Sequence, residues 1–71
     1  MPEMRFVTSS SIEAIGYDPD KMELHVSFLQ SGETYVYYNV ESRIFDESMQ
    51  EDSKGMYLNN QIKEIFYYRK L

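Results

Sequence analysis

The chain has 71 residues, a formal net charge of −5, seven tyrosines and four phenylalanines, but no cysteine. This length excludes a second hydrophobic core, and the missing cysteine excludes disulfides and thiolate metal sites. Because no apolar run approaches the roughly 18 residues of a membrane span and the N-terminus lacks a signal-peptide core, we expect one soluble, cytoplasmic domain over residues 1–71, without a membrane partner.

The charge is unevenly distributed along the chain. Residues 1–52 hold three cations against eleven acids, a net −8, and residues 53–71 hold four cations against one acid, a net +3. A bipolar chain can attract partners of either sign or associate with copies of itself. The plainer interpretation is that the acids keep a small, aromatic-rich domain soluble.

Short strands are predicted for the N-terminal third of the chain. Residues 5–8 are a candidate short edge strand, residues 8–11 form a polar break, and residues 12–17 are predicted to form a strand. The segment Asp18-Pro19-Asp20-Lys21 favours a type I turn, because Asp suits its first position and Pro its second.

The strand over residues 12–17 has two possible registers. In one, Ile15 and Tyr17 face the core and Glu13 goes with them. In the other, a bulge turns Glu13 outward, and three residues face the core: Ile12, Ala14 and Gly16. We favour the bulge, because burial of an unpaired glutamate is costly.

A hairpin is predicted from residues 22–29 and 33–40. With Ser31-Gly32 as a two-residue turn, where glycine supplies the positive φ, Phe28 pairs with Tyr35 and Val26 with Tyr37. One face then collects apolar and aromatic side chains that we expect in the core: Leu24, Val26, Phe28, Tyr35 and Tyr37. The outward face carries His25, Val36 and Tyr38.

The apolar spacing becomes helical after residue 40. One stripe begins near an N-cap at Glu41 or Ser42 and comprises Val40, Ile44, Phe45, Ser48 and Met49. A second helix begins at Asp52-Ser53, carries Leu58, Ile62, Ile65 and Phe66, and frays near residues 67–71. The order predicts an α+β domain: a three-stranded antiparallel meander, with a possible short N-terminal edge strand, followed by two helices packed on one face.

Several spaced segments together resemble the KTSC domain, over about residues 7–71. They are Ser10–Pro19, Leu24–Phe28, Gly32, Tyr35–Tyr37, Ser53–Gly55, Asn59 and Ile62–Lys63. This small bacterial and phage-associated domain is named after a C-terminal segment of some lysyl-tRNA synthetases, and the resemblance implies RNA binding by that association. The chain departs from the family at Val40-Glu41, where Val-Pro is common, and at Leu58, where Phe is usual.

The sequence predicts no catalytic residues, cofactor or metal site. His25 is expected to be a solvated strand residue without an enclosed pocket, although Glu23 and Ser27 share its face. The segment Asp18-Pro19-Asp20 does not continue as a calcium loop, because Met22 breaks the alternation of oxygen ligands.

Cationic, aromatic and amide side chains gather near the C-terminus: Asn59, Lys63, Tyr67, Tyr68, Arg69 and Lys70. This combination is typical of single-stranded nucleic-acid binding, although Tyr67 could instead pack inward while Arg69 and Lys70 offset helix-end carbonyls. We predict a small non-enzymatic module that binds RNA or single-stranded nucleic acid weakly through a basic, aromatic C-terminal helix. The alternative is a protein-interaction or self-association module, as a homodimer for example, that uses the acidic surface and the outer sheet face with His25, Val36 and Tyr38.

Overall fold

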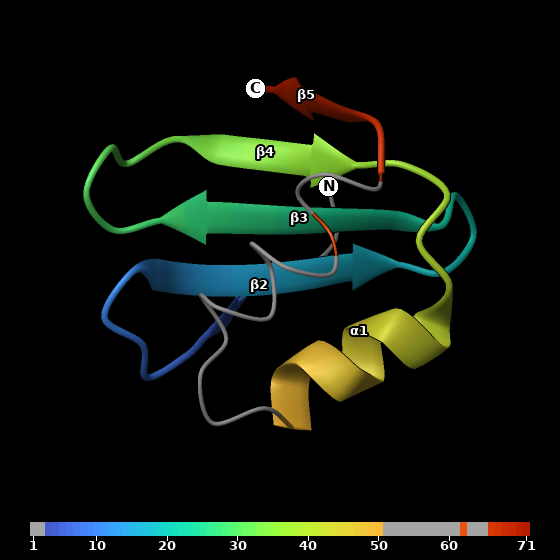
Figure 1. The fold of residues 1–71 in the computed structure, drawn as a ribbon, viewed down its shortest axis with the longest axis horizontal. Helices are drawn as coiled ribbons and strands as arrows, with labels where there is room; N and C mark the ends of the chain where they lie inside the picture. Colours follow the sequence, from blue (N-terminus) through green and yellow to red (C-terminus); the bar gives the residue numbers. More distant parts are fainter. Residues whose placement is uncertain (1–2, 51–61, 63–65) are drawn as a thin grey trace.

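In the part of the chain that the structure describes, five antiparallel strands in sequential order form one sheet, and a helix lies beside it (Figure 1). The computed structural model describes residues 3–50, 62 and 66–71. The elements are β1 (Arg5–Phe6), β2 (Ile12–Asp18), β3 (Glu23–Phe28), β4 (Thr34–Tyr37), α1 (Ser42–Gln50) and β5 (Tyr68–Lys70). The predicted α+β class and the short N-terminal edge strand are confirmed, and the three predicted strands of the meander are present as β2, β3 and β4. The prediction is incomplete, because the sheet formed by the described residues has a further strand, β5.

The C-terminal residues form a strand where we expected the fraying end of a second helix. β5 pairs antiparallel with β4, with Arg69 opposite Val36, and the Tyr38 amide donates a hydrogen bond of 2.9 Å to the Tyr67 carbonyl. Pairing satisfies backbone groups that β4 would otherwise leave open at the sheet edge, and tyrosine favours strands. The rest of the predicted second helix, residues 51–61 and 63–65, lies outside the described residues.

The central hairpin has a longer loop than predicted. Val26 lies opposite Tyr35 and Leu24 opposite Tyr37, and the Phe28 amide donates to the Glu33 carbonyl at 3.0 Å. Residues 29–32 form the loop, and its last residue, a glycine, has a φ of 69°. The predicted two-residue turn is therefore wrong. Because the register shifts by two residues, each side chain nevertheless keeps its predicted face.

The bulge expected in β2 is present, but it lies between Ile12 and Ala14. It allows both Ile12 and Ile15 to enter the core, where both are fully buried, while Glu13 turns outward and accepts a 3.0 Å hydrogen bond from the Ser27 hydroxyl. The favoured register is correct for Ile12 and Glu13. It is wrong for Ala14 and Gly16, which lie on the opposite face because each pairs with an outward residue of β3.

One face of the sheet, here called the core face, carries the packed interior. Its fully buried cluster comprises Ile12, Ile15, Leu24, Val26, Tyr37, Val40 and Ile62. The prediction that Tyr35 and Tyr37 belong to the core is confirmed: Tyr37 is fully buried, and Tyr35 is half-buried against the cluster. The core-face residues of the hairpin are therefore the ones that the alternating pattern predicts.

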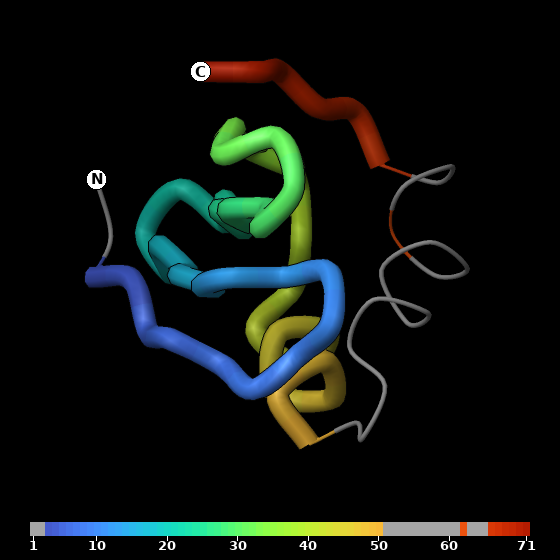
Figure 2. The backbone as a smooth tube through the Cα atoms, turned by 90° about the vertical axis from the view of Figure 1, so that its left-hand side faces the viewer, coloured from blue at the N-terminus to red at the C-terminus, as the bar shows by residue number. Residues whose placement is uncertain are grey.

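α1 lies along the β2 side of the sheet, away from β5 (Figures 1 and 2). The Phe45 ring stacks on Tyr17 with centroids 5.2 Å apart, and the Tyr17 hydroxyl donates to the Val40 carbonyl. The Glu41 carbonyl accepts the Ile44 amide at 2.9 Å, which makes Glu41 the N-cap. The predicted stripe is confirmed, because its members are buried or pack against the core. Among the described residues, no helix is long and apolar enough to cross a membrane.

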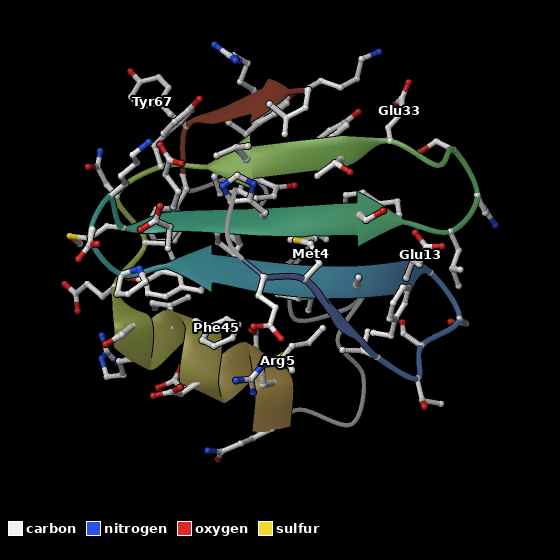
Figure 3. The ribbon with its side chains drawn as sticks, turned by 180° about the vertical axis from the view of Figure 1, so that it is seen from behind. Met4, Arg5, Glu13, Glu33, Phe45 and Tyr67 are labelled. Atoms are coloured by element: carbon white, nitrogen blue, oxygen red, sulfur yellow. The ribbon has the colours of Figure 1, made fainter. Side chains whose placement is uncertain are left out.

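The opposite face, here called the back face, carries Gly16, His25, Val36 and Tyr38. The N-terminal segment crosses it, with Met4 over the sheet (Figure 3). A Cβ added to Gly16 would lie 2.6 Å from the Met4 sulfur and 2.9 Å from the Glu3 carbonyl oxygen. Gly16 is therefore required by the close approach of this segment.

Candidate functional site at the C-terminal edge strand

The strand β5 divides the predicted nucleic-acid residues between the two faces of the sheet. Successive side chains of a strand point to opposite faces of the sheet. Tyr68 lies opposite Tyr37 on the core face, and Arg69 lies opposite Val36 on the back face. A helix would have distributed these residues around one cylinder. The strand instead produces two adjacent surfaces that share one edge.

Tyrosine rings dominate the core-face side of this edge. Tyr68 stacks on Tyr35 with centroids 5.5 Å apart and nearly parallel planes, 1° from each other. Tyr35 in turn meets the edge of Phe28 at 5.5 Å. Tyr68 keeps 55% of its surface exposed and the neighbouring Tyr67 keeps 84%. Tyr67 therefore does not pack inward. The edge presents two accessible rings: Tyr68, which is stacked on Tyr35, and Tyr67, which is almost fully exposed.

A hollow of about 290 Å³ opens beside this ring row, at the hairpin end of the sheet. Phe28 and Tyr35 form its aromatic wall, and the polar lining residues are Ser11, Gln30, Ser31 and Glu33. An aromatic wall with polar groups around it can hold a flat, partly polar ligand by stacking and hydrogen bonding.

The cation next to these rings is already paired. Lys70 Nζ lies 3.0 Å from Glu33 Oε1, and this hydrogen bond, with the charge of Glu33, raises the pKa of Lys70. A phosphate that approaches Lys70 must therefore compete with a carboxylate. Any contact with an anion at this point is expected to be weak and sensitive to salt.

The back-face side of the edge is a polar hollow of about 320 Å³. It is lined by Asp18, Lys21, Glu23, His25, Val36, Tyr38, Arg69 and Leu71. The structure thus unites Arg69, predicted for nucleic acid, with the three residues predicted for protein interaction. Two of those three are deeply buried: His25 exposes 5% of its surface and Val36 exposes 3%.

The expectation that His25 is solvated is wrong. It lies in the middle of the sheet, paired with Gly16 on one side and Val36 on the other, and both neighbours are buried. Its Nε2 lies 3.3 Å from Glu23 Oε1, whereas its Nδ1 is buried without a hydrogen-bond partner among the described residues. Such an unpaired buried group costs about 1–3 kcal/mol.

The remaining predicted site residues, Asn59 and Lys63, lie outside the described residues. Within residues 3–50, 62 and 66–71, no group of three metal-ligating side chains converges. Sequence reasoning missed two features: Glu33 is the partner of Lys70, and Arg69 lines the same hollow as His25. The strand preference of Tyr67-Tyr68 was the available signal, because it argues against helix in this segment.

Comparison with known proteins gives one consistent family. The KTSC domain family model matches residues 8–67. A protein of Tsukamurella paurometabola is 41% identical over 63 residues, which are 89% of this chain and 92% of that protein. An uncharacterised protein of Stutzerimonas stutzeri is 36% identical over 83% of this chain and 82% of its own length. The crystal structure of a KTSC domain protein from Yersinia pestis superposes with a TM-score of 0.94 at 38% identity, covering 100% of this chain and 99% of that one.

Proposed function

This chain belongs to the KTSC domain family, and from that premise we propose that it is a non-enzymatic module that binds single-stranded nucleic acid, RNA in particular. The binding element is the edge strand β5 with Tyr67 before it. Binding is weak, because the cations are few and the whole chain carries a net charge of −5.

The observation that carries the proposal is the pair of accessible rings at the edge. Tyr68 is held parallel to Tyr35, so its orientation is fixed before a ligand arrives, and Tyr67 exposes 84% of its surface. Bases stack on such rings with about 1–3 kcal/mol each, largely without regard to sequence. Lys70 and Arg69, on alternate faces of the same strand, supply the cations for the phosphates.

The proposal is tested by fluorescence anisotropy with a labelled single-stranded oligouridine on the full chain. Tyr67→Ala and Tyr68→Ala should each weaken binding by about 5-fold to 150-fold, the equivalent of one lost stacking contact. Arg69→Gln should reduce the steepness of the plot of log affinity against log salt by about 1, the change expected when one phosphate contact is lost.

Phe6→Ala is the matched control for the ring substitutions. Phe6 exposes 81% of its surface, but it lies in β1, at the other end of the five-strand order. Its loss should leave binding unchanged. Equal losses for Phe6→Ala and Tyr67→Ala, or no binding by the unchanged chain at about 50 mM salt, would eliminate the proposal.

The alternative function, protein interaction through His25, Val36 and Tyr38, has less support. His25 and Val36 together offer almost no accessible surface, whereas interfaces gain most of their energy from side chains that are exposed before binding and buried after it. Sedimentation of the same samples separates the two, because self-association requires a concentration-dependent increase in mass.

A further inference from the structure

The hollow of about 290 Å³ at the hairpin end, here called the hairpin hollow, has walls that are in place before any ligand arrives. The Gly32 amide donates a hydrogen bond of 3.0 Å to the Phe28 carbonyl, across the loop. The Leu29 amide donates to the Ser11 carbonyl at 2.9 Å, which ties the loop to the segment before β2. Because this backbone pairing holds the lining residues, a ligand loses little binding energy in ordering them.

Two aromatic rings form a corner in this hollow. Phe28 and Tyr35 have ring centroids 5.5 Å apart and planes inclined at 73°, and both residues are half-buried. A flat ring that stacks on one of them meets the other edge to face, and these are the two arrangements that aromatic rings favour. The corner therefore suits a planar aromatic ligand, such as the base of a nucleotide.

Among the described residues that line the hairpin hollow, only Glu33 is charged. Its Oε1 lies 3.0 Å from Lys70 Nζ, and its Oε2 accepts a hydrogen bond of 3.5 Å from the Tyr35 hydroxyl. These two neighbours orient the carboxylate, although the side chain keeps 38% of its surface exposed. Because each carboxylate oxygen has two lone pairs, both oxygens can accept a further hydrogen bond from a ligand.

A carboxylate distinguishes the bases by the donors on their Watson–Crick edges, because it only accepts hydrogen bonds. Guanine presents two adjacent donors, N1–H and the N2 amino group, which match the two carboxylate oxygens in the same way as an arginine fork does. Adenine and cytosine each place an acceptor nitrogen beside their amino group, and uracil places a carbonyl on each side of its single donor. Those acceptors would face the negative charge and be repelled by it.

The charges around the hollow disfavour two other kinds of ligand. A phosphate or carboxylate ligand would meet the negative charge of Glu33 as its only ionic lining group among the described residues. An arginine side chain has the donor pattern of guanine, but it is cationic and would lie near the Lys70 ammonium, which already pairs with Glu33. A neutral base with two adjacent donors meets neither repulsion.

We infer that the hairpin hollow binds a guanine base, and this inference rests on the proposed function, since the base belongs to the single strand that β5 binds. N1–H and the N2 amino group donate to the Glu33 carboxylate, and the ring packs in the aromatic corner. Glu33 and Tyr67 lie toward opposite ends of the β5 edge (Figure 3), and Tyr68 stacks on Tyr35 between them. The chain therefore prefers strands that contain guanine, although stacking on the edge rings is indifferent to sequence.

The experiment compares three labelled pentanucleotides on the full chain by fluorescence anisotropy. They are UUGUU, UUAUU and UUIUU, in which the inosine lacks the N2 amino group. UUGUU should bind about tenfold more tightly than UUAUU, as expected for a two-donor contact to a base, and UUIUU should lie between them. Glu33→Gln should remove the preference for UUGUU, because an amide presents one donor beside one acceptor. The measured quantity is the ratio of affinities, since loss of the Glu33 charge also releases Lys70 for phosphates.

Glu47→Gln is the matched control, because Glu47 on α1 is also exposed and paired with a cation, Arg43, at 3.4 Å. It should leave the preference for UUGUU intact, and binding of UUAUU by each variant shows that the variant is folded. Equal binding of UUGUU and UUAUU by the unchanged chain, or a preference that survives Glu33→Gln, would overturn the inference while the edge proposal stands. Displacement of UUGUU by N-acetylargininamide as effectively as by guanosine would overturn it too.

The ring substitutions separate this inference from the proposed function. A guanine preference that depends on Glu33, together with unchanged binding by Tyr67→Ala and Tyr68→Ala, would support the hairpin hollow and eliminate the edge strand as the binding element. The absence of binding to all three pentanucleotides, by the unchanged chain and by Glu33→Gln, would overturn both.

Discussion

The substitution Tyr37→Phe isolates one buried hydroxyl. Tyr37 is fully buried at the centre of the core face, and its hydroxyl has no hydrogen-bond partner among the described residues. Removing an unsatisfied buried hydroxyl recovers part of its desolvation cost of about 1–3 kcal/mol, less the loss of packing by one oxygen atom. At about pH 8 the variant should therefore be as stable as the unchanged chain or more stable by about 1 kcal/mol.

The same hydroxyl makes stability depend on alkaline pH. Burial, with smaller contributions from Tyr35 and Tyr68, raises the pKa of Tyr37 from 10.0 to about 12. Between these values the unfolded chain loses the proton while the folded chain keeps it, so stability is complete below pH 10 and falls as pH rises. At about pH 11 the loss from this group amounts to about 1.4 kcal/mol.

Urea unfolding at about pH 8 and pH 11 measures both effects by the linear extrapolation of unfolding free energy. Tyr37→Phe should show a smaller alkaline loss than the unchanged chain by about 1.4 kcal/mol. Tyr38→Phe, which removes a phenol from the back face, is the matched control. A variant destabilised by more than about 1 kcal/mol at pH 8, or an undiminished alkaline loss, would refute this reasoning.

Three further substitutions test the fold. Tyr17→Phe should cost about 1–2 kcal/mol in urea unfolding, because it leaves the buried Val40 carbonyl without its donor; a cost near zero would mean that the bond contributes nothing. Ile15→Ala should cost about 2–5 kcal/mol, since Ile15 is fully buried, and a smaller loss would contradict the register of β2. Gly16→Ala should cost about 1–3 kcal/mol and speed amide exchange at Met4, because the new Cβ lies 2.9 Å from the Glu3 carbonyl; unchanged exchange would disprove the contact.

The faces of the hairpin were predictable because side-chain direction alternates with a period of two. The loop is two residues longer than the predicted glycine turn, so each strand partner is shifted by two residues. Val26 and Tyr37 nevertheless point to the core. An even shift leaves the hydrophobic pattern intact, so the pattern alone could not distinguish the two registers. The helix stripe from Val40 to Met49 was equally predictable from its spacing.

The strand preference of Tyr67 and Tyr68 was the one local signal for the structure of residues 67–71, and it was too weak to decide between strand and helix. The segment has too few apolar residues to show a period, and the helix predicted from Asp52-Ser53 onward suggested continuation. The open edge of β4 decided otherwise, because its backbone groups gain partners from Tyr67 and Leu71. This one change placed the candidate cations on opposite faces and made Arg69 line the same hollow as His25.

The burial of His25 has a similar origin. An alternating strand predicts only that His25 lies opposite to Leu24 and Val26, and a small domain usually leaves such a face to solvent. Here the N-terminal segment crosses the back face near Gly16, and β5 adds a further strand beside β4. Both contacts join residues distant in sequence, so no local pattern encodes them.

The amino-acid sequence by itself therefore determined the α+β class, the inward and outward faces of the hairpin, the α1 stripe and the family resemblance. Each of these depends on side-chain periodicity or on short motifs that neighbouring residues carry. The tertiary structure alone decided the fifth strand, the pairing of Lys70 with Glu33 and the enclosure of His25. Those features depend on contacts between the ends of the chain and residues distant in sequence, where an open strand edge offers backbone groups to pair with.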